Sequence, residues 1–296
     1  MEKEYLYWLC CQPCLGAVSI RKLYEYLQSL EAIYNIEETA LENAGILTKA
    51  QIRALVGWRS SFPDCRREYQ SLERSNIRFV TPLDSDYPRR LLEIYDYPMG
   101  IFVKGTLPME KLPTVAVVGA RGCSSYGERL AEEFSRVLSE QQVQVISGLA
   151  VGIDGAAHRG SLRAGRPTFG VLGCGVDICY PASNYSLYEA MGRTGGIISE
   201  FPLRSHPKPR HFPMRNRIIS GLSDAVLVVE ARERSGSLIT AELGLEQGRD
   251  IFAVPGRITD RLSMGCNQLI QQGAYMAISP NDILEYLGVK HQKELI

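Results

Sequence analysis

The chain has 296 residues and a formal net charge of +0, with 45% hydrophobic and 22% charged residues. These proportions are typical of a soluble globular protein and exclude a disordered chain and a uniformly basic nucleic-acid coat. No run approaches the roughly 18 apolar residues of a membrane span, and the N-terminus lacks the apolar core of a signal peptide. We therefore expect a cytoplasmic protein without a membrane partner.

Residues 1–75 contain short amphipathic stretches. Apolar residues recur at helical spacing in the segment 20–30, and "LTKAQIRALVGW" repeats the pattern after Gly45. We expect a small all-helical domain that resembles a SAM or helix–hairpin–helix module, although the G-x-G of the latter is missing. A plain interaction or spacer bundle is the alternative. Cys11 and Cys14 form a C-x-x-C without a second pair at zinc spacing, so we interpret them as apolar residues rather than as a redox or metal site.

From residue 76 to residue 296, short apolar runs alternate with helical patterns. The runs are "TVAVVG", "VQVISG", "PTFGVLG", "GGIISE", "DAVLVVEA" and "DIFAVPG". Continuous apolar runs indicate strands that are covered on both faces, and strand–helix alternation indicates a parallel sheet. The predicted fold class is α/β, a Rossmann-like, doubly wound, mainly parallel sheet that follows the helical domain.

Ligands of such sheets bind beyond the carboxyl ends of the strands. The first run leads into "VVGARGCSSYG", which resembles a dinucleotide turn, but Arg121 replaces the second glycine and Ser124 the third. The second strand ends at Ser147-Gly148, with no acid for a ribose until Asp154. Both departures count against NAD, and we expect no cofactor.

Glycine and serine recur in the loops at this edge, where bare N–H groups and small hydroxyls can surround an anion. The sequence therefore predicts a phosphate site that includes Gly119, Arg121, Ser147, Gly148, Gly173, Gly175, Ser235, Gly236 and Ser237.

The segment 204–217, "RSHPKPRHFPMRNR", has five Arg or Lys residues, two His and no acid. We expect Lys208 and Arg210 to contact phosphates. Pro213 suits the first turn of a helix to about Leu222, whose opening turns would hold three further predicted contacts, Arg215, Asn216 and Arg217. Either arginine could instead pair with Glu200 or Glu230. The two arginines point about 200° apart on a helix, which argues against one shared purpose.

Catalytic constellations are sparse. We interpret Asp154 and His158 as a helix cap and a helix-surface histidine, with a catalytic pair as the alternative. Asp177 and Glu200 are expected to hold loops or to orient arginines. No Walker A motif or G-x-S-x-G elbow occurs. We predict no catalytic residue and no metal site, so the protein is not expected to be an enzyme.

Residues 76–288 closely resemble the DNA-processing protein A (DprA, or Smf) family. The resemblance rests on seven blocks in order, which read "VVGAR…SSYG", "SGLAVGIDGAAH", "GCGVDICYPASN", "SEFP", "FPMRNRIISGLSD", "VVEARERSGSLITAELGLEQGRDIFAVPG" and "GCNQLIQQGA". It implies single-stranded DNA binding, protection of incoming DNA and RecA loading in natural transformation. It also implies a homodimer, expected through residues 262–278. Many members have a C-terminal winged helix, which we do not expect before Ile296.

Two positions depart from the family pattern. Val151 and Tyr185 stand where cations are common, and Tyr185 follows Asn184 in the "YPxxN" block. We include Asn184 in the predicted site. Tyr185 and Tyr188 are predicted to stack on bases, with packing of Tyr188 against its own helix as the alternative.

A rival function is a nucleoside-monophosphate phosphoribohydrolase. "SGSLITAE" resembles the PGGxGTxxE loop of such enzymes, but Ser235 replaces a glycine and Glu242 follows Thr240 by two residues rather than three. A protein-binding scaffold is a third possibility, and it predicts no salt-sensitive affinity for DNA.

Overall fold

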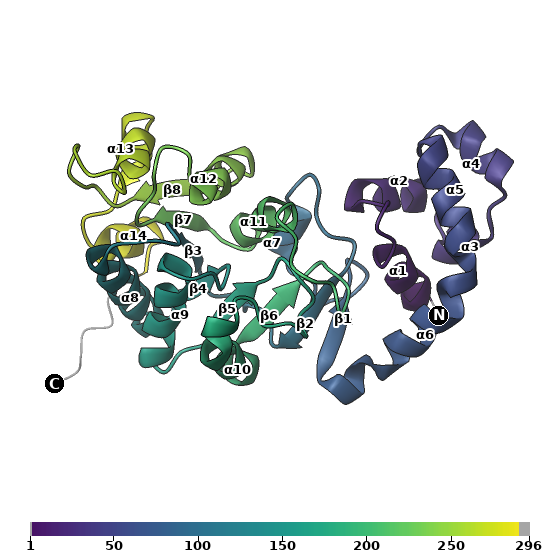
Figure 1. Cartoon of the computed structure of the whole chain (residues 1–296), viewed down its shortest axis with the longest axis horizontal. Coiled ribbons are helices and arrows are strands. Elements are labelled where there is room, and N and C mark those ends of the chain that lie inside the picture. Colours follow the sequence, from purple (N-terminus) through teal and green to yellow (C-terminus); the bar gives the residue numbers. More distant parts are fainter. Residues whose placement is uncertain (1, 290–296) are drawn as a thin grey trace.

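The computed structural model describes residues 2–289. An N-terminal group of helices leads into one large sheet flanked by further helices (Figure 1). The N-terminal elements are α1 (Glu2–Cys10), α2 (Ala17–Leu27), α3 (Leu30–Asn35), α4 (Glu38–Ala44), α5 (Lys49–Gly57), η1 (Trp58–Ser61), α6 (Phe62–Ser71) and η2 (Leu72–Ser75). No helix in residues 2–289 combines the length and the apolar character needed to cross a membrane.

The sheet has nine strands within the described residues, in the order β1-β2-β6-β5-β4-β3-β7-β8-β9. The strands from β6 to β9 in this order are parallel, whereas β2 runs antiparallel to both β1 and β6. The six apolar runs form β3 to β8, which confirms the predicted Rossmann-like class. The strands are β1 (Ile77–Val80), β2 (Ile101–Gly105), β3 (Thr114–Val118), β4 (Gln144–Ser147), β5 (Thr168–Val171), β6 (Gly196–Ser199), β7 (Ala225–Val228), β8 (Asp250–Ala253) and β9 (Tyr275–Met276).

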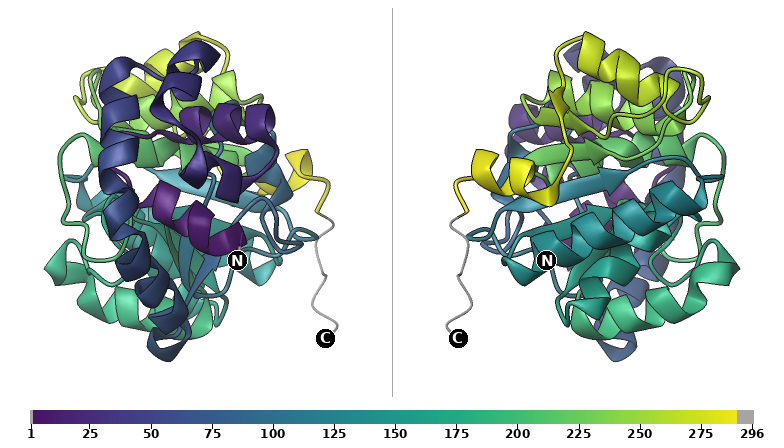
Figure 2. Two further views of the ribbon diagram at one scale, coloured as in Figure 1. Left: turned by 90° about the vertical axis from the view of Figure 1, so that its right-hand side faces the viewer. Right: turned by 90° about the vertical axis from the view of Figure 1, so that its left-hand side faces the viewer.

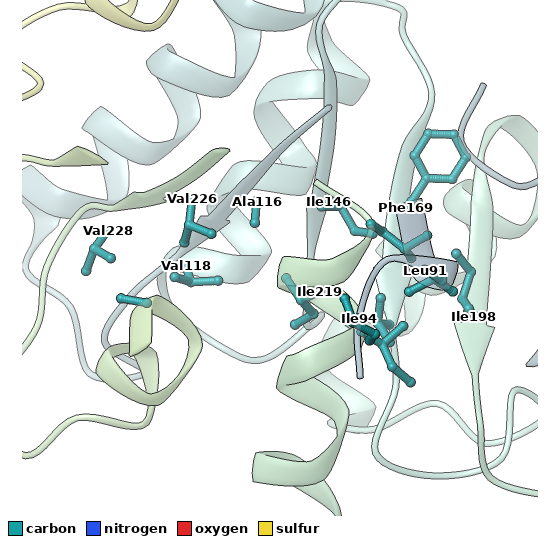
Figure 3. Packing of buried hydrophobic residues seen from close by; sticks show 14 of the residues in the cluster. Leu91, Ile94, Ala116, Val118, Ile146, Phe169, Ile198, Ile219, Val226 and Val228 are labelled. Carbon is teal, nitrogen blue, oxygen red and sulfur yellow. The ribbon is translucent and has the colours of Figure 1, made fainter. Parts of the chain in front are cut away.

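Helices cover both faces of the sheet. One face carries α8 (Ser125–Glu140), α9 (Ile153–Arg163), α10 (Tyr185–Thr194), which follows η3 (Ala182–Asn184), and α14 (Pro280–Tyr286). The other carries α7 (Arg89–Leu92), α11 (His211–Gly221), α12 (Gly236–Glu246) and α13 (Met264–Gln271). In Figure 3, Ile219 of α11 lies against the strands that carry Val118 and Ile146.

The path of the chain creates a crevice beside β3. From β3 the chain adds β4, β5 and β6 on one side, and then α11 carries it back to β7 on the other side of β3. The loops that follow β3 and β7 therefore leave the same edge in opposite directions. In doubly wound sheets this reversal is the place where ligands bind.

The N-terminal helices pack against the β1–β2 end of the sheet (Figure 1), and they lie in front of the sheet when the molecule is viewed from that end (Figure 2, left). Tyr7 of α1 contacts Phe79 and Phe102, with ring centroids 5.2 and 5.6 Å apart. Helix η2 ends at Ser75 and β1 begins at Ile77, so helix gives way to strand beside the predicted boundary. The division into domains 1–75 and 76–296 and the SAM or helix–hairpin–helix likeness stay predictions.

Candidate functional site

A cleft of about 660 Å³ lies at the carboxyl ends of β3 and β7. The turn after β3, including Gly119 and Arg121, forms one wall. The first turns of α11 and the loop that leads from β7 into α12 form the others. The sheet topology thus places the cleft where the sequence predicts the site.

Four arginines line the cleft: Arg121, Arg215, Arg232 and Arg234. Asp154 is the one carboxylate among the described residues that line it. Three of the arginines are exposed, and none of the four forms an ion pair shorter than 4.0 Å within residues 2–289. The guanidinium of Arg121 lies 5.1 Å from the centre of the Phe212 ring, a cation–π geometry. The cleft is therefore strongly electropositive.

Arg215 is a buried, fixed charge in this cleft. Its side chain donates hydrogen bonds to the carbonyls of Gly148, at 2.7 Å, and Val171. Burial lowers the pKa of Arg215 to about 10, although Asp154 opposes this effect, so Arg215 stays protonated at neutral pH. A Cβ on Gly148 would lie 2.5 Å from the Arg215 guanidinium. Glycine at 148 thus lets the guanidinium approach the backbone.

Asp154 and His158 do not form a pair. Asp154 Oδ2 accepts from the backbone N–H groups of Gly148, at 3.1 Å, and Ala150, at 3.4 Å, and burial raises the Asp154 pKa. The predicted helix-surface position of His158 is wrong, because its side chain is fully buried on α9. Nδ1 lies 2.8 Å from the Thr168 hydroxyl, and burial lowers the His158 pKa to about 3.

Glu230, which follows β7, fixes the turn that carries Arg121. Its carboxylate accepts from the backbone N–H of Ser124 at 2.8 Å and from the Ser124 hydroxyl at 2.5 Å. Its carbonyl accepts from the Ala120 N–H at 2.7 Å. Glu230 therefore joins two walls of the cleft and does not pair with an arginine in the described residues.

Of the predicted phosphate contacts, the structure brings one group together along the cleft: Gly119, Arg121, Arg215, Asn216, Ser235, Gly236 and Ser237. The others lie outside its lining: Ser147, Gly148, Gly173, Gly175, Asn184, Tyr185, Tyr188, Lys208, Arg210 and Arg217. Some of these support the loops. The Asn184 amide donates to the carbonyls of Leu149 and Ala150, both at 3.0 Å, and Gly148 seats Arg215 as described.

Three side chains of the second group make contacts within the protein, and their contact with DNA stays a prediction. Arg217 pairs with Asp96 at 2.8 Å and with Glu200 at 2.7 Å, as the internal alternative anticipated for Glu200. The Tyr188 hydroxyl donates to the Val176 carbonyl at 2.6 Å, and only 4% of this residue is exposed. The Ser147 hydroxyl is buried and donates to the Val117 carbonyl.

Four of the cationic and aromatic residues that line the cleft were not predicted: Arg232, Arg234, Tyr180 and Phe212. A signal for the arginines was present, because "RER" directly precedes the Ser-Gly-Ser turn. The two aromatic residues come from the loop before η3 and from α11, and their ring centroids lie 5.7 Å apart.

Cys11 and Cys14 pack against two different apolar clusters, which agrees with their interpretation as apolar residues. Within residues 2–289, no group of three or more His, Cys, Asp or Glu side chains is arranged to hold a metal ion.

The family model for DNA recombination-mediator protein A matches residues 78–288. DNA processing protein DprA of Streptococcus pneumoniae is 48% identical over 271 residues, which cover 85% of this chain and 96% of that protein. Protein Smf of Escherichia coli is 43% identical over 259 residues, which cover 86% of this chain and 67% of that protein.

Solved structures of DprA proteins are also similar to this chain. The crystal structure of DprA from S. pneumoniae aligns with a TM-score of 0.84 at 37% identity and covers 95% of this chain and 97% of that one. DprA from Helicobacter pylori, whose structure is described as giving insights into its single-stranded DNA binding mode, aligns with a TM-score of 0.64 at 25% identity. That match covers 71% of this chain and 95% of the other. The family model and the relatives agree with the order of motifs and with the fold, and the chain belongs to the DprA/Smf family of DNA-processing proteins.

Proposed function

We propose that this protein binds single-stranded DNA without sequence preference, through consecutive phosphates laid along the carboxyl edge of the sheet. The observation that carries the proposal is the cleft itself, whose described lining includes four arginines and one carboxylate, the buried Asp154. The single-stranded DNA binding mode described for the H. pylori relative supports it.

The cleft offers contacts to both parts of a nucleotide. Arg121 is exposed and can hold one phosphate with two parallel N–H donors, while Arg215 supplies a fixed charge behind it. Phe212 and Tyr180 offer ring faces on which bases can stack, each worth about 1–3 kcal/mol. Stacking needs unpaired bases, so this arrangement favours a single strand over a duplex.

The residues of the cleft favour binding of a nucleic acid over hydrolysis of a nucleotide. Glu242, the acid expected of a phosphoribohydrolase, is exposed and does not line the cleft. Asp154 already accepts from two backbone N–H groups. We infer a non-catalytic protein, and release of free base from AMP would contradict this.

The family resemblance extends the proposal to a cytoplasmic homodimer that protects incoming DNA and helps to load RecA in natural transformation. The predicted dimer segment, 262–278, includes the edge strand β9, and Met276 and Ile278 are 52% and 70% exposed. An Ile278→Asp variant should lower the mass measured by light scattering from that of two chains to that of one.

The direct test is fluorescence anisotropy with single- and double-stranded oligonucleotides across a salt series. Single-strand affinity should fall with a slope of about −0.7 log units per contacted phosphate per log[salt]. Arg121→Ala should flatten that slope by about one contact, and Arg121→Lys should retain it. If Arg121→Ala left the salt slope unchanged, DNA would not bind in this cleft and the proposal would be contradicted.

A further inference from the structure

Two cations lie beyond the cleft, on the loop between β8 and α13. Arg257 and Arg261 are exposed, and neither forms an ion pair shorter than 4.0 Å within residues 2–289. No prediction from the sequence used them, and neither lines the cleft. Their position in the sheet makes them relevant to the path of a bound strand.

This loop leaves the same edge of the sheet as the cleft. Strands β3, β7 and β8 are adjacent and parallel, so the loops that follow them emerge side by side. Two strand spacings, or about 10 Å, separate β3 from β8. In Figure 1 this region, with α12 and α13, lies at the end of the sheet opposite the N-terminal helices.

The loop is also joined to the wall of the cleft by hydrogen bonds. The Ala231 N–H donates to the Leu262 carbonyl at 2.7 Å, and the Gly265 N–H donates to the Ala231 carbonyl at 2.8 Å. Arg232, which lines the cleft, directly follows Ala231, and Arg261 directly precedes Leu262. The backbones that carry these two arginines are therefore fixed against each other.

Charge along this path stays positive. Its acids are Glu233 and Asp260, and Asp260 Oδ1 accepts from the Leu262 N–H at 3.0 Å. Four arginines, Arg232, Arg234, Arg257 and Arg261, outnumber them. A polyanion in the cleft would meet further guanidiniums if it continued towards β8.

We propose that the single strand leaves the cleft past Arg232 and Arg234 and continues onto the β8–α13 loop, where Arg257 and Arg261 contact its phosphates. This proposal rests on the proposed function and adds a direction to it: the bound strand crosses β3, β7 and β8 in turn. It makes the binding site longer than the cleft.

The test is the double variant Arg257→Ala/Arg261→Ala, titrated with a labelled oligothymidylate of about 20 nucleotides across a salt series. Losing two phosphate contacts should flatten the slope of log affinity against log[salt] by about 1.4. The matched control is Lys111→Ala/Arg166→Ala. It removes the same charge from two exposed cations that precede β3 and β5, at the amino edge of the sheet, and should leave the slope unchanged.

Three results would overturn the proposal. An unchanged slope in the double variant, with Arg121→Ala still flattening it, would end the path at the cleft and leave the proposed function intact. If the control variant flattened the slope equally, the effect would come from the change in net charge and not from contacts of the β8–α13 loop. If the double variant had a lower molecular mass than the wild type in light scattering, the loop would contact a second chain instead of the DNA strand. If Arg121→Ala also had no effect, the proposed function itself would fail.

Discussion

Arg215 and Arg217 lie two residues apart on α11 and enter opposite surroundings. Arg215 donates to the Gly148 carbonyl beside the cleft, whereas Arg217 pairs with Asp96 and Glu200 on the other side of the helix. Two residues correspond to a rotation of about 200° around a helix. About half a turn of α11 thus separates the charge beside the cleft from the charge that is paired within the fold.

Arg217→Ala should destabilise the protein by about 3 kcal/mol, because it leaves the mostly buried carboxylate of Glu200 without its partner. Urea denaturation measures this loss. Arg193→Ala removes an exposed arginine that lies 3.8 Å from Glu189 and should cost less than about 0.5 kcal/mol. The salt slope of DNA binding by folded Arg217→Ala should match that of the wild type. A flatter slope at unchanged stability would place Arg217 among the phosphate contacts.

Phe212→Leu should weaken single-strand binding by at least about 1 kcal/mol, because leucine keeps apolar bulk but offers no ring face to a base. Its salt slope should not change, since no charge is lost. Tyr185→Leu is the control, because Tyr185 is 59% exposed but lies outside the cleft lining. Anisotropy titrations measure both. If only Tyr185→Leu lost affinity for the single strand, bases would stack on Tyr185 of α10 and not on Phe212.

Much of this arrangement could be predicted because apolar runs report burial directly. Each of the strands β3 to β8 is buried along almost its whole length, and the sequence marks each with a continuous apolar run. Once these strands are parallel, their carboxyl ends must share an edge. The sequence therefore predicts that Arg121 and the Ser235–Ser237 turn lie close together, and both line the cleft.

The direction of individual side chains and the conformation of long loops could not be predicted from apolar runs. Helical spacing predicted that Arg215 and Arg217 do not share one purpose, but not which of them pairs internally. The ion pairs of Arg217 with Asp96 and Glu200 decide this. Phe212 and Tyr180 meet because the segment 172–210 folds back on itself. The carboxylate of Asp177 accepts from the Arg204 N–H there, at a left-handed backbone position that no local pattern announces. This contact confirms the prediction that Asp177 holds a loop.

The buried His158 should make stability depend on pH in a defined window. The Thr168 hydroxyl donates to the Val145 carbonyl, so it accepts from His158 Nδ1–H, and the imidazole is neutral. Burial holds the His158 pKa at about 3, below its ordinary value of about 6.5 in the unfolded chain. The unfolded state therefore binds more protons between these values. The contribution of His158 is complete above pH 6.5 and is lost as pH falls towards 3.

Between pH 7 and pH 5 the wild type should consequently lose about 2 kcal/mol more stability than His158→Gln, which has no such proton to bind. Urea denaturation at the two pH values measures the difference. His206→Gln, at an exposed position, should follow the wild type. Equal pH dependence in wild type and His158→Gln would show that the histidine is hydrated or charged in the folded protein.

Gly148→Ala should impair DNA binding by displacing Arg215, although it removes no charged side chain. The new Cβ would lie 2.5 Å from the Arg215 guanidinium, which must then leave the Gly148 carbonyl. With Arg215 displaced, the salt slope should flatten by about 0.7, as for the loss of one phosphate contact. Gly122→Ala is the matched control in the same cleft, because a Cβ there meets nothing within 4 Å.

The double variant Gly148→Ala/Arg215→Ala distinguishes this mechanism from a general loosening of the loop. If Gly148→Ala acts only by moving Arg215, the double variant should bind as weakly as Arg215→Ala and no more weakly, since the two changes share one path. Anisotropy titrations at matched salt measure the comparison, and thermal melts confirm that each variant is folded. Additive losses would mean that Gly148 contributes to the cleft independently of Arg215.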